Sequence, residues 1–349
     1  MTLRAALICG VMLSAAGCGT PARLFLHPVG TVAGTPAEFG AAFEDVRMPR
    51  PGGGATRAWW VPREGDAAAV VLFGGNSGNR SHHLAYARMA WDAGFSVLMV
   101  DYQGFGPDNG EPDPGAFGQD AMAAIDFARG RATRIGVWGI SLGSSVALLA
   151  AGLRPGDVSA ICVEGSFRLG PAMRHYMAHV MPAVIAAPLA ALTRALFIPG
   201  DADPERNLAR LHGRVPVLFV HGDRDRLTRT VWGAQLFERT RGPRELWLME
   251  DTGHAPEPLR SCEGEYAARI AAFFRETLLG VPAQKAGAVW SAARVEDGWE
   301  VRAEVVTGGP YPAAVEVVAV GETEVSRVRL AVRRRVTRVT LTLGERPQA

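Results

Sequence analysis

The stretch RIGVWGISLGSSVALLAAGL, residues 134–153, decides the fold. It runs from an apolar strand candidate, Arg134–Trp138, through Gly139-Ile140-Ser141-Leu142-Gly143 into a helical stretch, Leu142–Leu153. A Gly-x-Ser-x-Gly between a strand and a helix predicts a sharp turn, where a Cβ at either glycine would clash. Such a turn holds the Ser141 hydroxyl clear of the sheet, beside the first amides of the helix. A Gly/Ser-rich helix start without chemistry is the alternative.

Outward from this turn, apolar strand candidates alternate with helical stretches over residues 41–280. The strand candidates are Phe43–Met48, Arg57–Val61, Ala68–Phe73, Ser96–Val100, Arg134–Trp138, Val158–Val163, Val215–Val220 and Glu245–Met249. The helical stretches are Arg80–Trp91, Phe117–Arg129, Leu142–Leu153, Leu227–Arg239 and Ser261–Leu278. The middle strands are apolar on both faces, which is typical of a parallel sheet covered by helices. The alternation predicts an α/β class domain with a mostly parallel, doubly wound sheet.

Two parts of the chain depart from this alternation. Residues 165–214 are expected to form a small helical lid inserted over the sheet. Within them Val180–Thr193 carries no charge, but its length and its two prolines argue against a membrane span. A segment that dips into a membrane is the alternative. Residues 283–349 show period-two runs between Gly-rich turns, which predicts a small C-terminal all-β, sandwich-like domain.

Acidic and basic side chains follow the later strand candidates. Val215–Val220 runs into Asp223 and Asp225, and the next strand candidate runs into His254. The carboxyl ends of parallel strands meet at one edge of a sheet, towards which Ser141 also points. A serine hydroxyl needs a base and an orienting carboxylate to become a nucleophile. We therefore expect His254 to accept the Ser141 proton and Asp225 to orient His254, with Asp223 as the competing acid.

A glycine-rich loop, GGNSGN at residues 74–79, follows the strand candidate Ala68–Phe73. Glycines let a backbone approach a substrate closely, so we expect the amides of Asn76 and Leu142 to form an oxyanion hole. The spacing fits neither a dinucleotide-binding nor a P-loop phosphate site. No Cys and His spacing typical of a metal site occurs, so neither a cofactor nor a metal is expected.

These motifs resemble those of serine hydrolases of the α/β-hydrolase superfamily, in the branch of monoglyceride-lipase-like and depalmitoylase-like enzymes. The matching stretches, in order over residues 42–280, are residues 73–82, residues 101–106, Gly139–Gly143, His221–Asp225 and Gly253-His254. The resemblance implies a triad of Ser141, Asp225 and His254. The chain departs from the family at Gly74-Gly75, where His-Gly is usual, and at Gln103, where Arg is common.

Together, residues and resemblance predict a serine hydrolase that cleaves carboxylic esters through an acyl-enzyme. Acyl esters of lipids and thioesters are among the candidate substrates. A serine peptidase of the same fold and a non-catalytic, envelope-anchored binding lipoprotein are the alternatives. The net charge of +2, from 37 basic and 35 acidic residues, shows no basic excess, so a nucleic-acid partner is not expected. The sequence does not indicate an oligomeric state.

The N-terminus reads as a targeting signal. Arg4 precedes an apolar stretch, Ala5–Ala16, and the following small residues lead to Cys18 in a pattern that resembles a bacterial lipobox. This predicts a lipoprotein signal peptide over residues 1–17, a lipid on Cys18 and a tether over residues 18–40. Gly19, in place of Asp, favours the outer membrane, facing the periplasm. Ordinary secretion and a buried N-terminal helix are the alternatives.

The remaining cysteines do not predict a disulfide. Cys9 leaves with the signal peptide and Cys18 carries the lipid, so only Cys162 and Cys262 remain. An oxidising compartment would permit a bridge between them. However, Cys162 lies in an apolar strand candidate and Cys262 at the start of a helical stretch, which favours two separate thiols.

Overall fold

The computed structural model describes residues 22–65, 68–180, 182–197, 200–261 and 263–281, together with five strands between residues 287 and 344. The chain divides into two compact units, the first ending at Val281 and the second beginning at Pro282. The predicted signal peptide, Cys18 and Cys262 lie outside the described residues. Cys162 is a buried free thiol.

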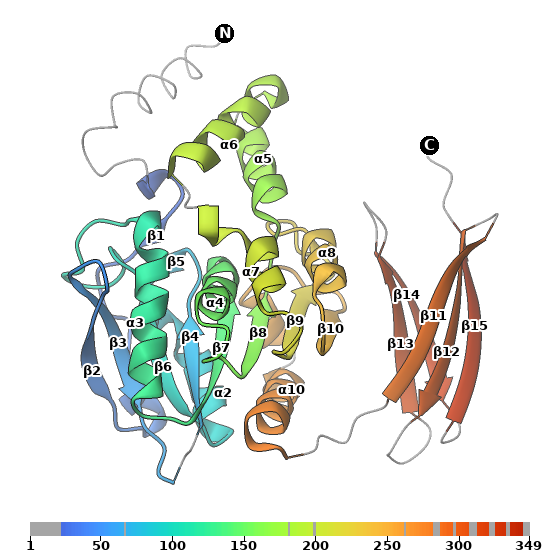
Figure 1. Ribbon diagram of the computed structural model, residues 1–349, viewed down its shortest axis with the longest axis horizontal. Coiled ribbons are helices and arrows are strands. Elements are labelled where there is room, and N and C mark those ends of the chain that lie inside the picture. Colours follow the sequence, from blue (N-terminus) through green and yellow to red (C-terminus); the bar gives the residue numbers. More distant parts are fainter. Residues whose placement is uncertain are drawn as a thin grey trace. The chain divides into compact units, whose positions relative to one another are not determined.

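An eight-stranded sheet forms the centre of the first unit, in the order β10-β9-β8-β7-β4-β6-β3-β2 (Figure 1). From β10 to β6 in this order the strands pair in parallel, whereas β3 pairs antiparallel with both β6 and β2. The predicted mostly parallel α/β sheet is therefore confirmed. Its strands are β2 (Glu44–Pro49), β3 (Ala55–Val61), β4 (Ala68–Phe73), β6 (Ser96–Asp101), β7 (Arg134–Ile140), β8 (Ala160–Glu164), β9 (Val217–Gly222) and β10 (Arg244–Met249).

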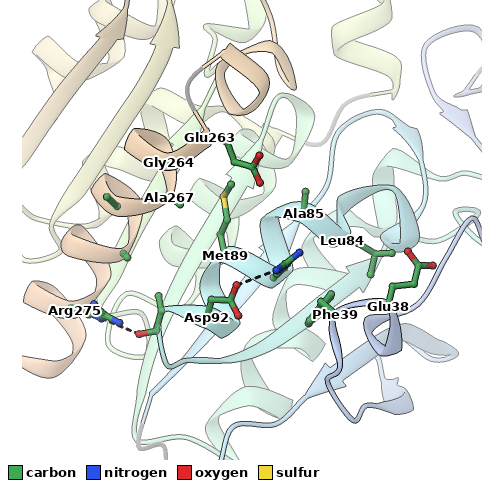
Figure 2. A pocket seen from close by; sticks show the side chains of 14 residues that line it. Glu38, Phe39, Leu84, Ala85, Met89, Asp92, Glu263, Gly264, Ala267 and Arg275 are labelled. Carbon is green, nitrogen blue, oxygen red and sulfur yellow. Dashed lines mark hydrogen bonds and ion pairs between the residues drawn. The ribbon is translucent and has the colours of Figure 1, made fainter.

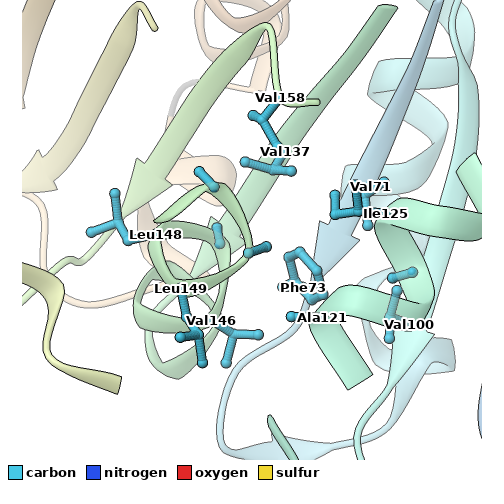
Figure 3. Close-up of a cluster of buried hydrophobic side chains, with 14 of the residues drawn as sticks. Val71, Phe73, Val100, Ala121, Ile125, Val137, Val146, Leu148, Leu149 and Val158 are labelled. Atoms are coloured by element: carbon cyan, nitrogen blue, oxygen red, sulfur yellow. The ribbon is translucent and has the colours of Figure 1, made fainter. Parts of the chain in front are cut away.

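Helices cover both faces of the sheet because β4, β6 and β7 have no polar face. Val71 and Phe73 of β4 pack with α3 and α4 in one core cluster (Figure 3), and Val70 and Leu72 pack with α2 and α10 in the other. Successive residues of a strand point to opposite faces, so one short strand supplies both layers. These four helices are α2 (Leu84–Asp92), α3 (Phe117–Arg129), α4 (Leu142–Leu153) and α10 (Glu263–Phe274). Three further helices of this unit are α7 (Pro204–Arg210), α8 (Thr230–Arg239) and α9 (Glu257–Ser261).

Between β8 and β9 the chain leaves the sheet and forms a helical insertion, which we call the lid. It consists mainly of α5 (Leu169–Val180) and α6 (Ala183–Phe197), which pack on each other through Met177, Ala186 and Ala190. A short 3-10 helix, Gly200–Ala202, and α7 lead back towards the sheet. In the part of the chain that the structure describes, no helix is both long and apolar enough to cross a membrane.

Residues 22–40, for which the sequence predicts a tether, belong to the first unit and contact the rest of it. The 3-10 helix Ala22–Leu24 is followed by β1 (His27–Pro28), which pairs in parallel with β5 (Ser77–Gly78), and a second 3-10 helix spans Pro36–Phe39. We refer to residues 25–33 as the strap. The segment is therefore held against the domain from Ala22 onwards.

The second unit consists of antiparallel strands. β11 (Gly287–Val295), β12 (Gly298–Val306) and β15 (Val336–Gly344) form one sheet, and β13 (Ala313–Val320) pairs with β14 (Val325–Val332) in another. The β character of these strands agrees with the period-two pattern of the sequence. A sandwich-like domain over residues 283–349 stays a prediction.

Candidate active site

Ser141 lies in a strained turn between β7 and α4. It has a φ of 55° and a ψ of −116°, in a region that non-glycine residues rarely adopt and that is found preferentially at functional sites. A Cβ at Gly139 would lie 2.1 Å from the carbonyl oxygen of Gly143. A Cβ at Gly143 would lie 2.0 Å from the carbonyl oxygen of Phe73. Both glycines of the Gly-x-Ser-x-Gly stretch are therefore required for the turn to form.

The structure brings Ser141, His254 and Asp225 into one hydrogen-bonded chain. The Nε2 atom of His254 lies 2.9 Å from Oγ of Ser141, and its Nδ1 atom lies 2.7 Å from Oδ2 of Asp225. Ser141 follows β7, Asp225 follows β9 and His254 follows β10, so the three residues come from the carboxyl ends of parallel strands. The geometry is that of a nucleophile, a base and an orienting acid.

Asp225 is held in place by groups that favour its charged form. Its Oδ1 atom accepts hydrogen bonds from the backbone N–H groups of Leu227 and Thr228, both at 2.9 Å, and the Thr228 hydroxyl donates to Oδ2 at 2.8 Å. Burial alone would raise the pKa of Asp225, but hydrogen bonds and positive charge from His221 and His254 outweigh it and hold the pKa below its usual value. An ionised Asp225 can then keep the Nδ1 proton on His254 and stabilise the imidazolium.

Asp223, the competing candidate for the acid, has a different position. Its Oδ1 atom accepts a hydrogen bond from the backbone N–H of Thr252 at 3.2 Å, and its own N–H donates to the carbonyl of Met249 at 3.0 Å. The carboxylate that contacts His254 is that of Asp225. Asp223 instead joins the loop after β9 to the turn after β10.

The glycine-rich loop after β4, residues 74–79, passes directly beside Ser141, and we call it the oxyanion loop. A Cβ at Gly75 would lie 3.8 Å from Cβ of Ser141. Directly after Ser141, the N–H of Leu142 is one of the first amides of α4, which have no acceptor within their own helix. The two segments from which the sequence predicts an oxyanion hole therefore both lie next to the nucleophile.

The ring of His83 forms hydrogen bonds with two backbone groups of the oxyanion loop. This role was not predicted from the sequence. Its Nε2 atom accepts a hydrogen bond from the N–H of Gly75 at 3.1 Å, so Nδ1 carries the proton and donates to the carbonyl of Asn79 at 3.2 Å. Burial lowers the pKa of His83 to about 4, which keeps the ring neutral at neutral pH. A Cβ at Gly74 would lie 2.5 Å from Cε1 of His83, so only a glycine leaves room for the ring. Gly74 is also the position at which the family usually has a histidine.

A second buried carboxyl group, that of Glu164, lies under the strained turn. The backbone carbonyl of Glu164 accepts the N–H of Ser141 at 2.8 Å, and its side chain accepts hydrogen bonds from the hydroxyls of Tyr266 and Tyr86. The residue is only 1% exposed. Burial raises the pKa of Glu164 to about 7, against the lowering effect of the Tyr266 and Tyr86 hydrogen bonds and of His254.

The groove shown in Figure 2 is separate from these residues. It lies between the 3-10 helix Pro36–Phe39, α2 and α10, and neither Ser141, Asp225 nor His254 lines it. In it Arg88 pairs with Asp92 at 3.3 Å, within α2. The described residues contain no group of three or more His, Cys, Asp or Glu side chains that could hold a metal ion.

Comparison with known proteins identifies relatives for part of the chain. No protein-family model matches it. The chain is similar to the α/β hydrolase domain-containing protein WAV2 of Arabidopsis thaliana, 32% identical over 38% of this chain and 46% of that protein. It is also similar to the human protein ABHD12B, 30% identical over 51% of each chain, so it spans about half the length of these two relatives. The uncharacterized protein YfhR of Salmonella typhi is 26% identical over 70% of this chain and 82% of that protein.

Solved structures share the fold. An esterase of Pyrococcus furiosus superposes with a TM-score of 0.59 and 18% identity, covering 73% of this chain and 98% of that one. The α/β hydrolase GrgF of Penicillium superposes with a TM-score of 0.54 and 18% identity, covering 68% of this chain and 99% of that one. The first unit therefore has the α/β-hydrolase fold. Membership of the α/β-hydrolase superfamily stays a prediction from the sequence motifs. The monoglyceride-lipase-like and depalmitoylase-like branch stays a prediction.

Replacing Glu164 by Gln should change how stability depends on pH. Below the unfolded pKa of 4.5 both states hold the proton. Between pH 4.5 and about 7 only the unfolded state gives it up, because burial keeps Glu164 protonated in the folded state, and this lowers the free energy of unfolding. Above about pH 7 both states are ionised and the loss of stability is complete. The Gln variant has no such proton. Its stability relative to wild type should therefore rise by about 3 kcal/mol between pH 4 and pH 8. Urea unfolding across this range measures the difference.

Glu263→Gln, at an exposed position in α10, is the matched control and should follow the wild type at every pH. Parallel stability curves for wild type and Glu164→Gln would contradict the raised pKa.

Proposed function

We propose that the protein is a serine hydrolase that cleaves carboxylic esters through an acyl-enzyme. The observation that carries the proposal is the hydrogen-bonded chain from Ser141 through His254 to Asp225, with Ser141 in a strained turn. A structural relative named as an esterase supports this choice of reaction within the fold.

In the proposed reaction, Oγ of Ser141 attacks the ester carbonyl carbon while Nε2 of His254 takes the hydroxyl proton. The electron pair of the carbonyl moves to its oxygen, where the N–H groups of Asn76 and Leu142 stabilise the negative charge. Collapse of this intermediate breaks the bond to the alcohol, which leaves with the proton from His254. Water then gives a proton to His254, attacks the acyl-enzyme and releases the acid, and the proton returns to Ser141.

The lid supports an apolar acyl group as part of the substrate. Leu192 of α6 is 53% exposed. Leu227, two residues after Asp225, is 55% exposed. Acyl esters of lipids and acyl thioesters are the substrate classes that such side chains suit.

Ser141→Ala should abolish labelling by a fluorophosphonate probe and lower kcat/KM for p-nitrophenyl esters by roughly 10⁴-fold or more, because no other group replaces the nucleophile. The measurement is gel fluorescence together with hydrolysis of the acetate, the palmitate and a peptide panel. Ser145→Ala, in the same helix but outside the triad, is the control and should label as wild type does. Folded wild-type protein that fails to label would favour the non-catalytic binding protein.

Asp225→Asn should lower kcat by roughly 10⁴-fold, because an amide no longer holds the proton on Nδ1 of His254 or stabilises the imidazolium. Asp223→Asn removes the same charge two positions away and should leave kcat within about tenfold of wild type, since an amide oxygen can still accept the Thr252 N–H. Steady-state kinetics on p-nitrophenyl acetate compares the two variants. Equal losses would contradict the assignment of Asp225 as the acid.

We further propose that the protein is a lipoprotein of the bacterial envelope, anchored through Cys18 and facing the periplasm from the outer membrane. Cys18→Ala should then take up no radiolabelled palmitate and should accumulate as an unprocessed precursor. Cys9→Ala, within the predicted signal peptide, should still be labelled. Equal palmitate incorporation by Cys18→Ala and wild type in cell fractions would contradict the anchor.

A further inference from the structure

Backbone hydrogen bonds join the strap to the oxyanion loop. The N–H of His27 donates to the carbonyl of Asn76 at 2.8 Å, and the N–H of Val29 donates to the carbonyl of Gly78 at 3.0 Å. They belong to the parallel pair β1–β5, in which each strand has only two residues. Isolated strand pairs are marginal even when they are much longer, so further contacts must hold this one together.

Two asparagine side chains supply these contacts. The Nδ2 atom of Asn76 donates to the carbonyl of Phe25 at 3.0 Å. The Nδ2 atom of Asn79 donates to the carbonyls of Val29 and Thr31 at 2.8 and 2.7 Å. Asn79 is 3% exposed, and its Oδ1 atom accepts the N–H of Ser81 at 2.9 Å. The Asn79 amide thus uses both donors on the strap and its acceptor on its own segment.

The strap also contacts the lid. The ring of Phe25 lies 5.6 Å from the ring of Tyr176 on α5, between centroids, and packs against the apolar cluster that α5 and α6 share. One residue earlier on α5, His175 lies within hydrogen-bond distance, 3.2 Å, of the carbonyl of Arg226 beside the triad acid. The same lid helix therefore contacts the loop of Asp225 directly and the oxyanion loop through Phe25.

The composition of the oxyanion loop explains why it needs such support. Gly74, Gly75 and Gly78 give the backbone many accessible conformations, and ordering each residue costs about 1–2 kcal/mol. An oxyanion hole is effective only when its N–H groups already point to where the charge will develop. Hydrogen bonds from a neighbouring segment, here the strap, can supply that order.

We propose that the strap is a positioning element of the oxyanion hole, in which Asn76 and Asn79 bind the loop to the strap and Phe25 links the strap to the lid. This rests on the proposed function, since it takes the N–H of Asn76 as an oxyanion donor. Negative charge on the carbonyl oxygen is largest in the transition state. Loosening the loop therefore lowers kcat and leaves KM nearly unchanged, and a shift of the lid is transmitted to the loop.

Asn79→Asp tests the asparagine contact. The aspartate keeps an oxygen for the N–H of Ser81 but turns a second oxygen towards the carbonyls of Val29 and Thr31, where it cannot donate. On p-nitrophenyl acetate, kcat should fall by roughly 10- to 100-fold while KM stays within about threefold. Amide hydrogen exchange of the peptide containing residues 74–79 should become faster.

Ser77→Ala is the matched control, since Ser77 lies in the same loop and is exposed. It should match wild type in kcat and in exchange. If Asn79→Asp does not fold, Asn76→Ala removes only the bond to Phe25 and should show the same pattern at a smaller size. Faster loop exchange without a loss of kcat would overturn the proposal, as would variants equal to wild type in both measurements.

Phe25→Ala tests the link to the lid without changing any residue of the loop. It should lower kcat several-fold and accelerate exchange of residues 74–79, because the strap loses its packing on Tyr176. Unchanged exchange and kcat would overturn the lid link. These outcomes are distinct from failure of the proposed function, in which wild type itself would neither hydrolyse esters nor react with a fluorophosphonate.

Discussion

The strained turn at Ser141 is the constraint on which the rest of the site depends. A non-glycine residue in such a conformation costs about 1–3 kcal/mol and persists only where its surroundings hold it. Here β7 lies between β4 and β8 in the middle of the sheet, and the N–H of Ser141 is bonded to the carbonyl of Glu164 at the end of β8. A Cβ at Gly143 would lie 2.0 Å from the carbonyl oxygen of Phe73, so the end of β4 packs directly against the turn. The same packing that strains Ser141 therefore places the oxyanion loop next to it.

Two buried carboxyl groups near His254 have opposite pKa shifts, and their surroundings explain why. Asp225 accepts two backbone N–H groups and a hydroxyl and lies against His221 and His254, so the charged form is favoured. The Glu164 side chain accepts hydrogen bonds from two phenol hydroxyls, and the effect of burial, which raises its pKa, is larger than theirs. Below about pH 7, Glu164 is therefore neutral, and the negative charge of the two carboxyl groups lies on Asp225, which contacts His254.

The sequence predicted the residues whose positions follow from periodicity. Ser141, Asp225 and His254 each follow a clearly apolar strand, and the parallel sheet brings strand ends together. Thr228, His83 and the strap have no such signal, because their contacts depend on loop conformation. A two-residue strand such as β1 shows no alternation, and its partner is about fifty residues away. Glu164 was not predicted, since a buried carboxyl needs Tyr86 and Tyr266 from distant helices to accommodate it.

The oxyanion loop shows how a glycine-rich segment can be ordered without a hydrophobic core of its own. Its carbonyl at Gly74 accepts the hydroxyl of Tyr102 at 2.7 Å, and the N–H of Gly75 donates to His83. The strap binds the next part of the loop, at the carbonyls of Asn76 and Gly78. These partners come from three separate segments, and each bonds a different peptide group. Tyr102 and His83 bond the loop at Gly74 and Gly75, whereas the strap bonds it at Asn76 and Gly78, so the strap is the partner of the part of the loop that carries the proposed oxyanion donor.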